Sequence, residues 1–221
     1  MLLVFDVDGT LIDSRAAIVE SARRTFATGE PPHPGDAAFL ATIGLLPERM
    51  MDRLFPERPE AERRAIARRY VEQVQAMRGE QAAAESPYDG VDALLAGVAE
   101  AGFTLGIATG KRRAGVDHML AQTGWSGLFR TLQTAESGPG KPDPTLIRNA
   151  MAETGHGPEA TVMIGDSVFD MEMARAAGVI AIGVDWGYNG RAALASAGAD
   201  HLVDSVPALG HLIAALRDRL P

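Results

Sequence analysis

Hydrophobic residues follow one pattern over most of the chain and another between residues 14 and 85. Outside that segment, apolar runs of strand length alternate with stretches whose apolar residues recur at helical spacing. The runs predict strands at residues 2–5, 103–108, 128–133, 161–164, 179–184 and 201–203. The stretches predict helices at residues 91–98, 113–122, 143–153, 168–177, 189–197 and from 207 onward. Single helices between strands need right-handed crossovers. The pattern therefore predicts an α/β fold whose open parallel sheet binds ligands at the carboxyl ends of its strands.

The segment from residue 14 to about residue 85 is rich in Ala, Arg and Glu at helical spacing. Ile18, Ala22 and Phe26 recur along one helical face after Ser14, which is a good N-cap residue. Further helices are predicted at residues 36–43, after Pro47 and at residues 60–85. We therefore predict a Rossmann-like core formed by residues 1–14 and 86–221, with an inserted module of about four helices at residues 15–85.

The loop at residues 42–49 breaks the helical pattern of this module at Gly44 and Pro47. Such a break would allow the loop to face a catalytic site in the core. We expect this placement, and with it a part for Glu48 or Arg49 in substrate selection.

Composition narrows the classes of partner. The formal net charge of −8 argues against a protein that coats nucleic acid or an anionic membrane, but a small phosphorylated substrate needs only a local positive site. The absence of cysteine excludes disulfides and thiolate zinc sites. No signal peptide or membrane span is evident at the N-terminus, because Asp6 and Asp8 interrupt its apolar run, and we expect a cytoplasmic protein.

Two carboxylates follow the first predicted strand directly. Asp6 and Asp8 point to the same side because side chains alternate along a strand. At about 4 Å such a pair repels by roughly 4 kcal/mol, so the site needs a cation or a retained proton. Gly9 and Thr10 then permit a sharp turn that brings amide N–H groups close to an anion. The alternative is an ordinary acidic turn that closes a strand.

Two further strand ends carry residues suited to a phosphate site. Thr109 and Gly110 lie between a predicted strand and a helix N-terminus, although Thr109 could simply fix the turn. Asp166 and Asp170 follow the strand at 161–164, although Asp170 could instead form a capping box with Ser167. Each of these positions therefore has a structural and a functional interpretation.

A lysine is framed by proline and glycine in the segment Gly-Pro-Gly-Lys141-Pro-Asp-Pro. These residues fix or free the backbone on each side of Lys141, which favours a defined role over that of an exposed turn lysine.

These positions supply four carboxylates, one lysine and one hydroxyl at one edge of the predicted sheet. Clustered carboxylates favour a hard divalent cation, and Mg²⁺ needs few protein ligands because it keeps several waters. The five histidines show no metal-ligand spacing and are expected to be surface or packing residues: His33, His118, His156, His201 and His211.

The motifs resemble, in order, those of the haloacid dehalogenase-like hydrolases, most of whose members are phosphatases. Asp6-Val-Asp8-Gly-Thr10 is similar to the first motif, Thr109 to the second, Lys141 to the third, and Asp166 with Asp170 to the fourth. Gly110 departs from the pattern, since the family usually has Asn there. The helical insertion is similar to the small cap of some members, among which the likeness is greatest to phosphoglycolate phosphatases.

The resemblance implies Mg²⁺-dependent hydrolysis of a small phosphorylated metabolite. Asp6 would form an aspartyl-phosphate, Asp8 would act as acid and base, and Asp8 also disfavours dehalogenase chemistry. Mg²⁺ would be held by Asp6, Asp166 and the backbone carbonyl of Asp8, with Asp170 close behind. The substrate phosphate would meet Gly9, Thr10, Thr109, Gly110 and Lys141. The alternatives are a sugar phosphomutase and a non-catalytic phosphate-binding module, and the expected state is a monomer or homodimer.

Overall fold

The central layer of the fold is a six-stranded parallel sheet in the order β5-β4-β1-β6-β7-β8. The computed structural model describes residues 1–80 and 85–217. The strands are β1 (Leu2–Phe5), β4 (Thr104–Ala108), β5 (Thr131–Gln133), β6 (Thr161–Gly165), β7 (Ile180–Val184) and β8 (His201–Val203). The chain starts at β1, extends the sheet to one side through β4 and β5, and then continues on the other side of β1. This reversal opens a crevice at the carboxyl end of β1, as expected for an open parallel sheet.

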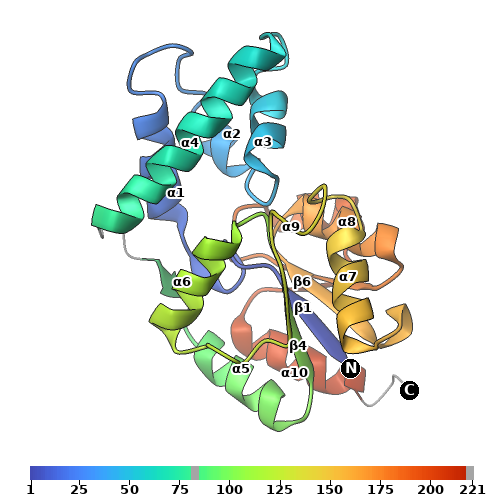
Figure 1. Ribbon diagram of the computed structural model, residues 1–221. Helices are drawn as coiled ribbons and strands as arrows, with labels where there is room; N and C mark the ends of the chain where they lie inside the picture. The colour runs from blue at the N-terminus through green and yellow to red at the C-terminus, as the bar shows by residue number, and fades with distance from the viewer. Residues whose placement is uncertain (81–84, 218–221) are drawn as a thin grey trace.

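Alternating side chains of β1 fill two separate apolar layers. Leu3 and Phe5 pack on one face of the sheet, and Leu2 and Val4 pack on the other, all fully buried. The first face is covered by α5 (Val91–Glu100), α6 (Arg113–Thr123) and α10 (Val206–Arg217). The second is covered by α7 (Thr145–Thr154), α8 (Val168–Ala177) and α9 (Arg191–Ala197), and Figure 1 shows the two groups on opposite sides of the sheet. The predicted parallel α/β sheet is confirmed.

The helices of residues 15–80 form a separate unit above the sheet in Figure 1. They are α1 (Arg15–Thr25), α2 (Asp36–Leu40), α3 (Pro47–Leu54) and α4 (Glu60–Glu80), and we call residues 15–80 the cap. The cap has its own apolar core, in which the rings of Phe26, Phe39, Phe55 and Tyr70 pack against one another. Phe169 of α8 belongs to the same apolar cluster, so the core of the cap extends to the sheet domain.

A short antiparallel ribbon joins the two units. It pairs β2 (Ile12–Asp13) with β3 (Ser86–Pro87), so the two segments that connect the sheet domain to the cap lie side by side. The sequence did not predict this ribbon because two residues are too few to show a strand period.

Local hydrogen bonds explain where helix boundaries differ from the prediction. The expected helix at 143–153 begins at Thr145, because an Asp143 oxygen accepts the Thr145 N–H at 2.9 Å. The expected helix at 36–43 ends at Leu40, where the N–H of Thr42 bonds back only three residues, to Phe39. Ser14 precedes α1 but makes no side-chain cap, since its hydroxyl donates to Asp8. Part of the helix predicted at 60–85 lies outside the described residues.

None of the helices in the described ranges has the length and apolarity needed to cross a membrane.

Candidate active site

The register of the central strands brings three predicted site residues to one edge of the sheet. Phe5 in β1 pairs with Ile107 in β4 on one side and with Ile164 in β6 on the other. Asp6 leaves β1 directly after this position, while Thr109 and Asp166 leave β4 and β6 two residues after it. The carboxyl ends of these strands therefore place the three side chains around one crevice.

The Asp6 carboxylate is 2% exposed and contacts a buried cation. One oxygen accepts the N–H of Val7 at 2.7 Å, and the other lies 2.8 Å from Lys141 Nζ. Burial raises the pKa of Asp6 to about 7, even though Lys141 opposes the shift. The site thus holds a carboxyl whose ionised form needs more positive charge than one lysine supplies.

Asp166 and Asp170 gather beside Asp6, so that one oxygen from each of the three acids lies within 4.8 Å of the others. Burial, together with Asp6 and Asp170, raises the pKa of Asp166 well above its usual range. Three buried carboxylic acids with one ammonium among them form a hard oxygen-donor set, which fits a divalent cation such as Mg²⁺.

Two contacts orient Asp166 within this cluster. One oxygen accepts a hydrogen bond from the Thr10 hydroxyl at 3.0 Å, and the other accepts the Tyr188 N–H at 2.8 Å. A Cβ at Gly9 or Gly187 would lie 2.3 Å from Asp166, so only glycine allows these loops to approach so closely. Gly9 was expected for its turn, and its φ is +85°. Gly187 carried no signal in the sequence.

Lys141 is 1% exposed, which excludes the alternative of a solvent-exposed turn lysine. Its Nζ lies 2.8 Å from Asp6 and 2.6 Å from Asp170. Burial alone would lower the pKa of Lys141, but Asp170 and Asp6 outweigh it and raise the pKa. Asp170 also forms the capping box, because its second oxygen accepts from the Ser167 N–H at 3.1 Å and from the Ser167 hydroxyl at 2.7 Å. Asp170 therefore caps α8 and positions Lys141 at once.

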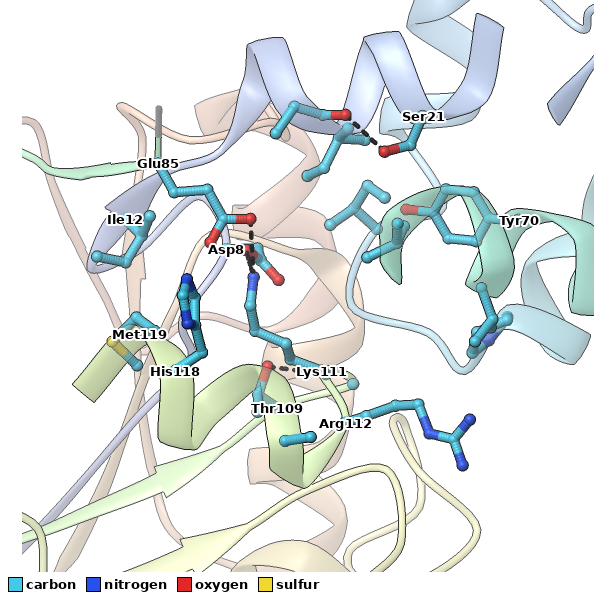
Figure 2. A pocket seen from close by; sticks show the side chains of 18 of the residues that line it. Asp8, Ile12, Ser21, Tyr70, Glu85, Thr109, Lys111, Arg112, His118 and Met119 are labelled. Atoms are coloured by element: carbon cyan, nitrogen blue, oxygen red, sulfur yellow. Dashed lines mark hydrogen bonds and ion pairs between the residues drawn. The ribbon is translucent and has the colours of Figure 1, made fainter. Parts of the chain in front are cut away.

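Asp8 has partners that the sequence did not reveal. One of its oxygens accepts from the Ser14 hydroxyl at 2.8 Å and lies 2.7 Å from Lys111 Nζ. Figure 2 shows Lys111 extended between Asp8 and Glu85, to which its ammonium is 3.2 Å away. The Ser14 hydroxyl is also hydrogen-bonded to the Tyr188 hydroxyl at 2.9 Å, and burial raises the pKa of Tyr188. Ser14 lies six positions from Asp8, whereas Lys111 is 103 positions away and directly follows the predicted Thr109-Gly110 pair.

Thr109 and Gly110 shape the turn after β4. The Thr109 hydroxyl accepts the Lys111 N–H at 3.2 Å, so the turn-fixing role proposed for it is present. A Cβ at Gly110 would lie 2.8 Å from the carbonyl oxygen of Gly44 and 3.0 Å from that of Leu45. The loop of the cap therefore fills the space next to Gly110, where the family pattern usually has an Asn side chain.

A cavity of about 940 Å³ lies between the sheet domain and the cap. Asp6, Asp8, Thr109, Gly110 and Lys111 are part of its wall on the sheet side. The predicted site residues Gly9, Thr10, Lys141, Asp166 and Asp170 do not line it.

The loop at 42–49 lines the cavity with Ile43, Gly44, Leu45 and Pro47, as its expected position implies. Glu48 and Arg49 are exposed and do not line it. His118, expected to be a surface or packing residue, is exposed and also forms part of the wall.

Comparison with known proteins agrees with the motifs. Residues 3–184 match the family model described as haloacid dehalogenase-like hydrolase. A phosphoglycolate phosphatase from Cupriavidus necator is 34% identical over 222 residues, covering 97% of this chain and 94% of that protein. A phosphoglycolate phosphatase from Agrobacterium fabrum is 30% identical over 194 residues, covering 85% and 81%.

The fold also matches that of a solved structure. The crystal structure of a predicted phosphatase from Clostridium acetobutylicum superposes with a TM-score of 0.84 and 25% identity, covering 96% of this chain and 97% of that one. The prediction of a phosphatase-type enzyme is thereby confirmed. The chain belongs to the haloacid dehalogenase-like hydrolase family.

Proposed function

We propose that this enzyme hydrolyses small phosphomonoesters with Mg²⁺, through an aspartyl-phosphate formed on Asp6. The observation that carries the proposal is the cluster at the end of β1. There the Asp6 carboxylate lies 2.8 Å from the Lys141 ammonium, and Asp166 and Asp170 contribute oxygens within 4.8 Å. Asp6 is also part of the cavity wall, so a substrate in the cavity can reach it.

Asp6, Asp166 and the backbone carbonyl of Asp8 are the groups that would hold the metal. Bound Mg²⁺ would supply positive charge that screens the nucleophile from the phosphate dianion. The buried oxygen donors and the raised pKa values of Asp6 and Asp166 support this assignment, because a cation would offset the charge that burial disfavours.

The chemistry divides into two displacements at phosphorus. Asp6 attacks the phosphorus, the ester P–O bond breaks, and the departing oxygen takes a proton from Asp8. Asp8 then accepts a proton from water, whose oxygen attacks the phosphorus and releases inorganic phosphate, which restores Asp6. The position of Asp8 in the cavity wall, held by Ser14 and Lys111, supports this double role.

The transferring phosphate would be bound by groups around Asp6. Lys141 and Thr109 would donate to its oxygens, and the backbone at Gly9, Thr10 and Gly110 would supply N–H groups. Asp170 would keep Lys141 in place. Phosphoglycolate is the first natural ester to assay, because two relatives are named for its hydrolysis.

The test measures phosphate release from p-nitrophenyl phosphate with Mg²⁺. We expect Asp6→Asn to lower kcat by more than about 1,000-fold, because the amide is a poor nucleophile. Asp117→Asn removes an exposed acid of α6 in the same way and should leave the rate unchanged. A parent enzyme without turnover, or an active Asp6→Asn variant, would refute the proposal.

A further inference from the structure

The cap side of the cavity is mainly apolar, although Gln75 adds a polar side chain to it. Its wall includes Ile18, Leu45, Met50, Tyr70, Val74 and Met77. Ser21 is also part of this wall, but its hydroxyl donates to the Ala17 carbonyl within α1 at 2.8 Å. Figure 2 shows Ser21 and Tyr70 across the cavity from Asp8 and Lys111. Over residues 15–77, whose side chains the structure describes, the cap contributes no charged side chain to the cavity wall.

The cations on the sheet side already have acidic partners. Lys111 Nζ lies 2.7 Å from Asp8 and 3.2 Å from Glu85. Arg112 Nε lies 3.1 Å from Glu136. All of these residues line the cavity, and the described part of the wall contains one further basic residue, His118. Beyond the phosphate site, a carboxylate on the substrate would therefore meet an apolar wall and a rim that contains Asp8, Glu85 and Glu136.

The cavity is also much larger than a two-carbon group requires. Its volume is about 940 Å³, and pockets of ~300–1,000 Å³ hold ligands of drug-like size. Glycolate would leave most of the cap wall without contact.

We propose that the leaving group of the natural substrate is an uncharged, mainly apolar alcohol, larger than glycolate, which packs against the cap wall. The proposal rests on the phosphomonoester hydrolysis proposed above and names its substrate class. Binding energy from burying the alkyl or aryl part would be used to hold the ester oxygen near Asp8. Phosphoglycolate, with its carboxylate, would be a poor substrate.

The experiment compares kcat/KM for ethyl, propyl, butyl and hexyl phosphate with that for phosphoglycolate, in the full-length enzyme with Mg²⁺. Each added methylene that reaches the cap wall should raise kcat/KM by roughly fourfold. The kcat/KM for phosphoglycolate should be at least about tenfold lower than that for propyl phosphate, which is similar in size but lacks the carboxylate.

A pair of variants tests the wall itself. Gln75 is exposed and lines the cavity, whereas its neighbour Ala76 is exposed and does not. Gln75→Lys adds a cation to the wall and should raise the ratio of phosphoglycolate to propyl phosphate turnover by about tenfold. Ala76→Lys adds the same charge outside the cavity and should leave the ratio unchanged.

The outcomes separate this proposal from the function on which it rests. Rising activity along the alkyl series together with the Gln75→Lys shift would support it. A parent enzyme that hydrolyses p-nitrophenyl phosphate but prefers phosphoglycolate to every alkyl phosphate would overturn the substrate class alone. Absence of turnover with every ester, p-nitrophenyl phosphate included, would overturn the proposed function and this inference with it.

Discussion

Asp8 carries two opposite tasks in the proposed reaction, and its neighbour Lys111 affects both. As an acid Asp8 must be protonated, and as a base it must be ionised. Lys111 Nζ lies 2.7 Å away, and the lysine side chain is only 7% exposed. A cation at this distance attracts an ionised carboxylate, so Lys111 contributes to the balance between the two tasks.

Replacing Lys111 should therefore move the pH profile. Lys111→Met removes the cation and raises the apparent pKa of the alkaline limb of kcat/KM, because Asp8 then keeps its proton to higher pH. Lys111→Arg keeps the charge and should leave the limb close to that of the parent enzyme. The measurement is kcat/KM for one alkyl phosphate from pH 5 to 9. Equal shifts in both variants would show that side-chain shape, not charge, is responsible.

Single residues were predictable where the local sequence is unusual. Asp6 and Asp166 stand out because each follows an apolar run, and Lys141 because Pro and Gly frame it. Lys111 and Ser14 were missed as partners of Asp8, and Tyr188 as a partner of Ser14. The Lys111–Asp8 contact spans 103 positions and the Ser14–Tyr188 contact spans 174, so only the folded chain shows them.

At the level of elements, the loop between α2 and α3 contacts three of the four core loops that carry motif residues. Gly44 and Leu45 approach Gly110, Gly44 also approaches Ser167, and Leu46 approaches Gly140. A Cβ added at Gly110 or Gly140 would lie 2.8 Å or 2.7 Å from the nearest cap atom. The cap therefore packs closely against the active-site loops at Gly110 and Gly140, where the absence of a side chain leaves room for it.

Gly110→Ala should weaken the packing of the cap against the sheet domain. The new methyl would meet backbone oxygens of Gly44 and Leu45, which cannot rotate away as a side chain can. We expect a loss of roughly 1–3 kcal/mol in the free energy of unfolding and a lower kcat/KM. Gly97→Ala in α5 is the control, because nothing lies within 4 Å of its added Cβ. It should stabilise the helix by about 0.5–1 kcal/mol. Urea denaturation compares the two, and an equally stable Gly110→Ala variant would contradict the packing described.

Core elements were predictable because their apolar periods are long and clear. The sequence located β1, β8 and α8 to the residue and the other core strands to within a few residues. It missed β2 and β3, because these two-residue strands pair across more than 70 positions of the sequence. It also overextended α2, because the backbone tightens into three-residue bonds at Thr42.

At the level of the whole molecule, folding buries acids that would otherwise be ionised. The pKa of Asp6 rises from 3.8 to about 7 on burial, so between these values the folded chain keeps a proton that the unfolded chain releases. Without metal, stability therefore falls as the pH rises through this window. Mg²⁺ competes with the proton for the same oxygens, and its stabilising effect must grow over the same range.

Thermal unfolding with EDTA or with Mg²⁺ at several pH values tests this linkage. The Tm in EDTA should fall from pH 5 to pH 8, and the increase in Tm caused by Mg²⁺ should be larger at pH 8. Asp166→Asn should remove most of the Mg²⁺ effect. An increase in Tm that is the same at both pH values, or unchanged in Asp166→Asn, would mean that the metal binds elsewhere.

The identity of the nucleophile tests the aspartyl-phosphate mechanism most directly. The test is to quench the enzyme in acid during turnover of p-nitrophenyl phosphate with Mg²⁺, reduce the acyl phosphate with borohydride, and map the peptides by mass spectrometry. We predict conversion of Asp6 to homoserine only when substrate is present. Unmodified Asp6 in enzyme that is turning over, or modification of another residue instead, would contradict the mechanism.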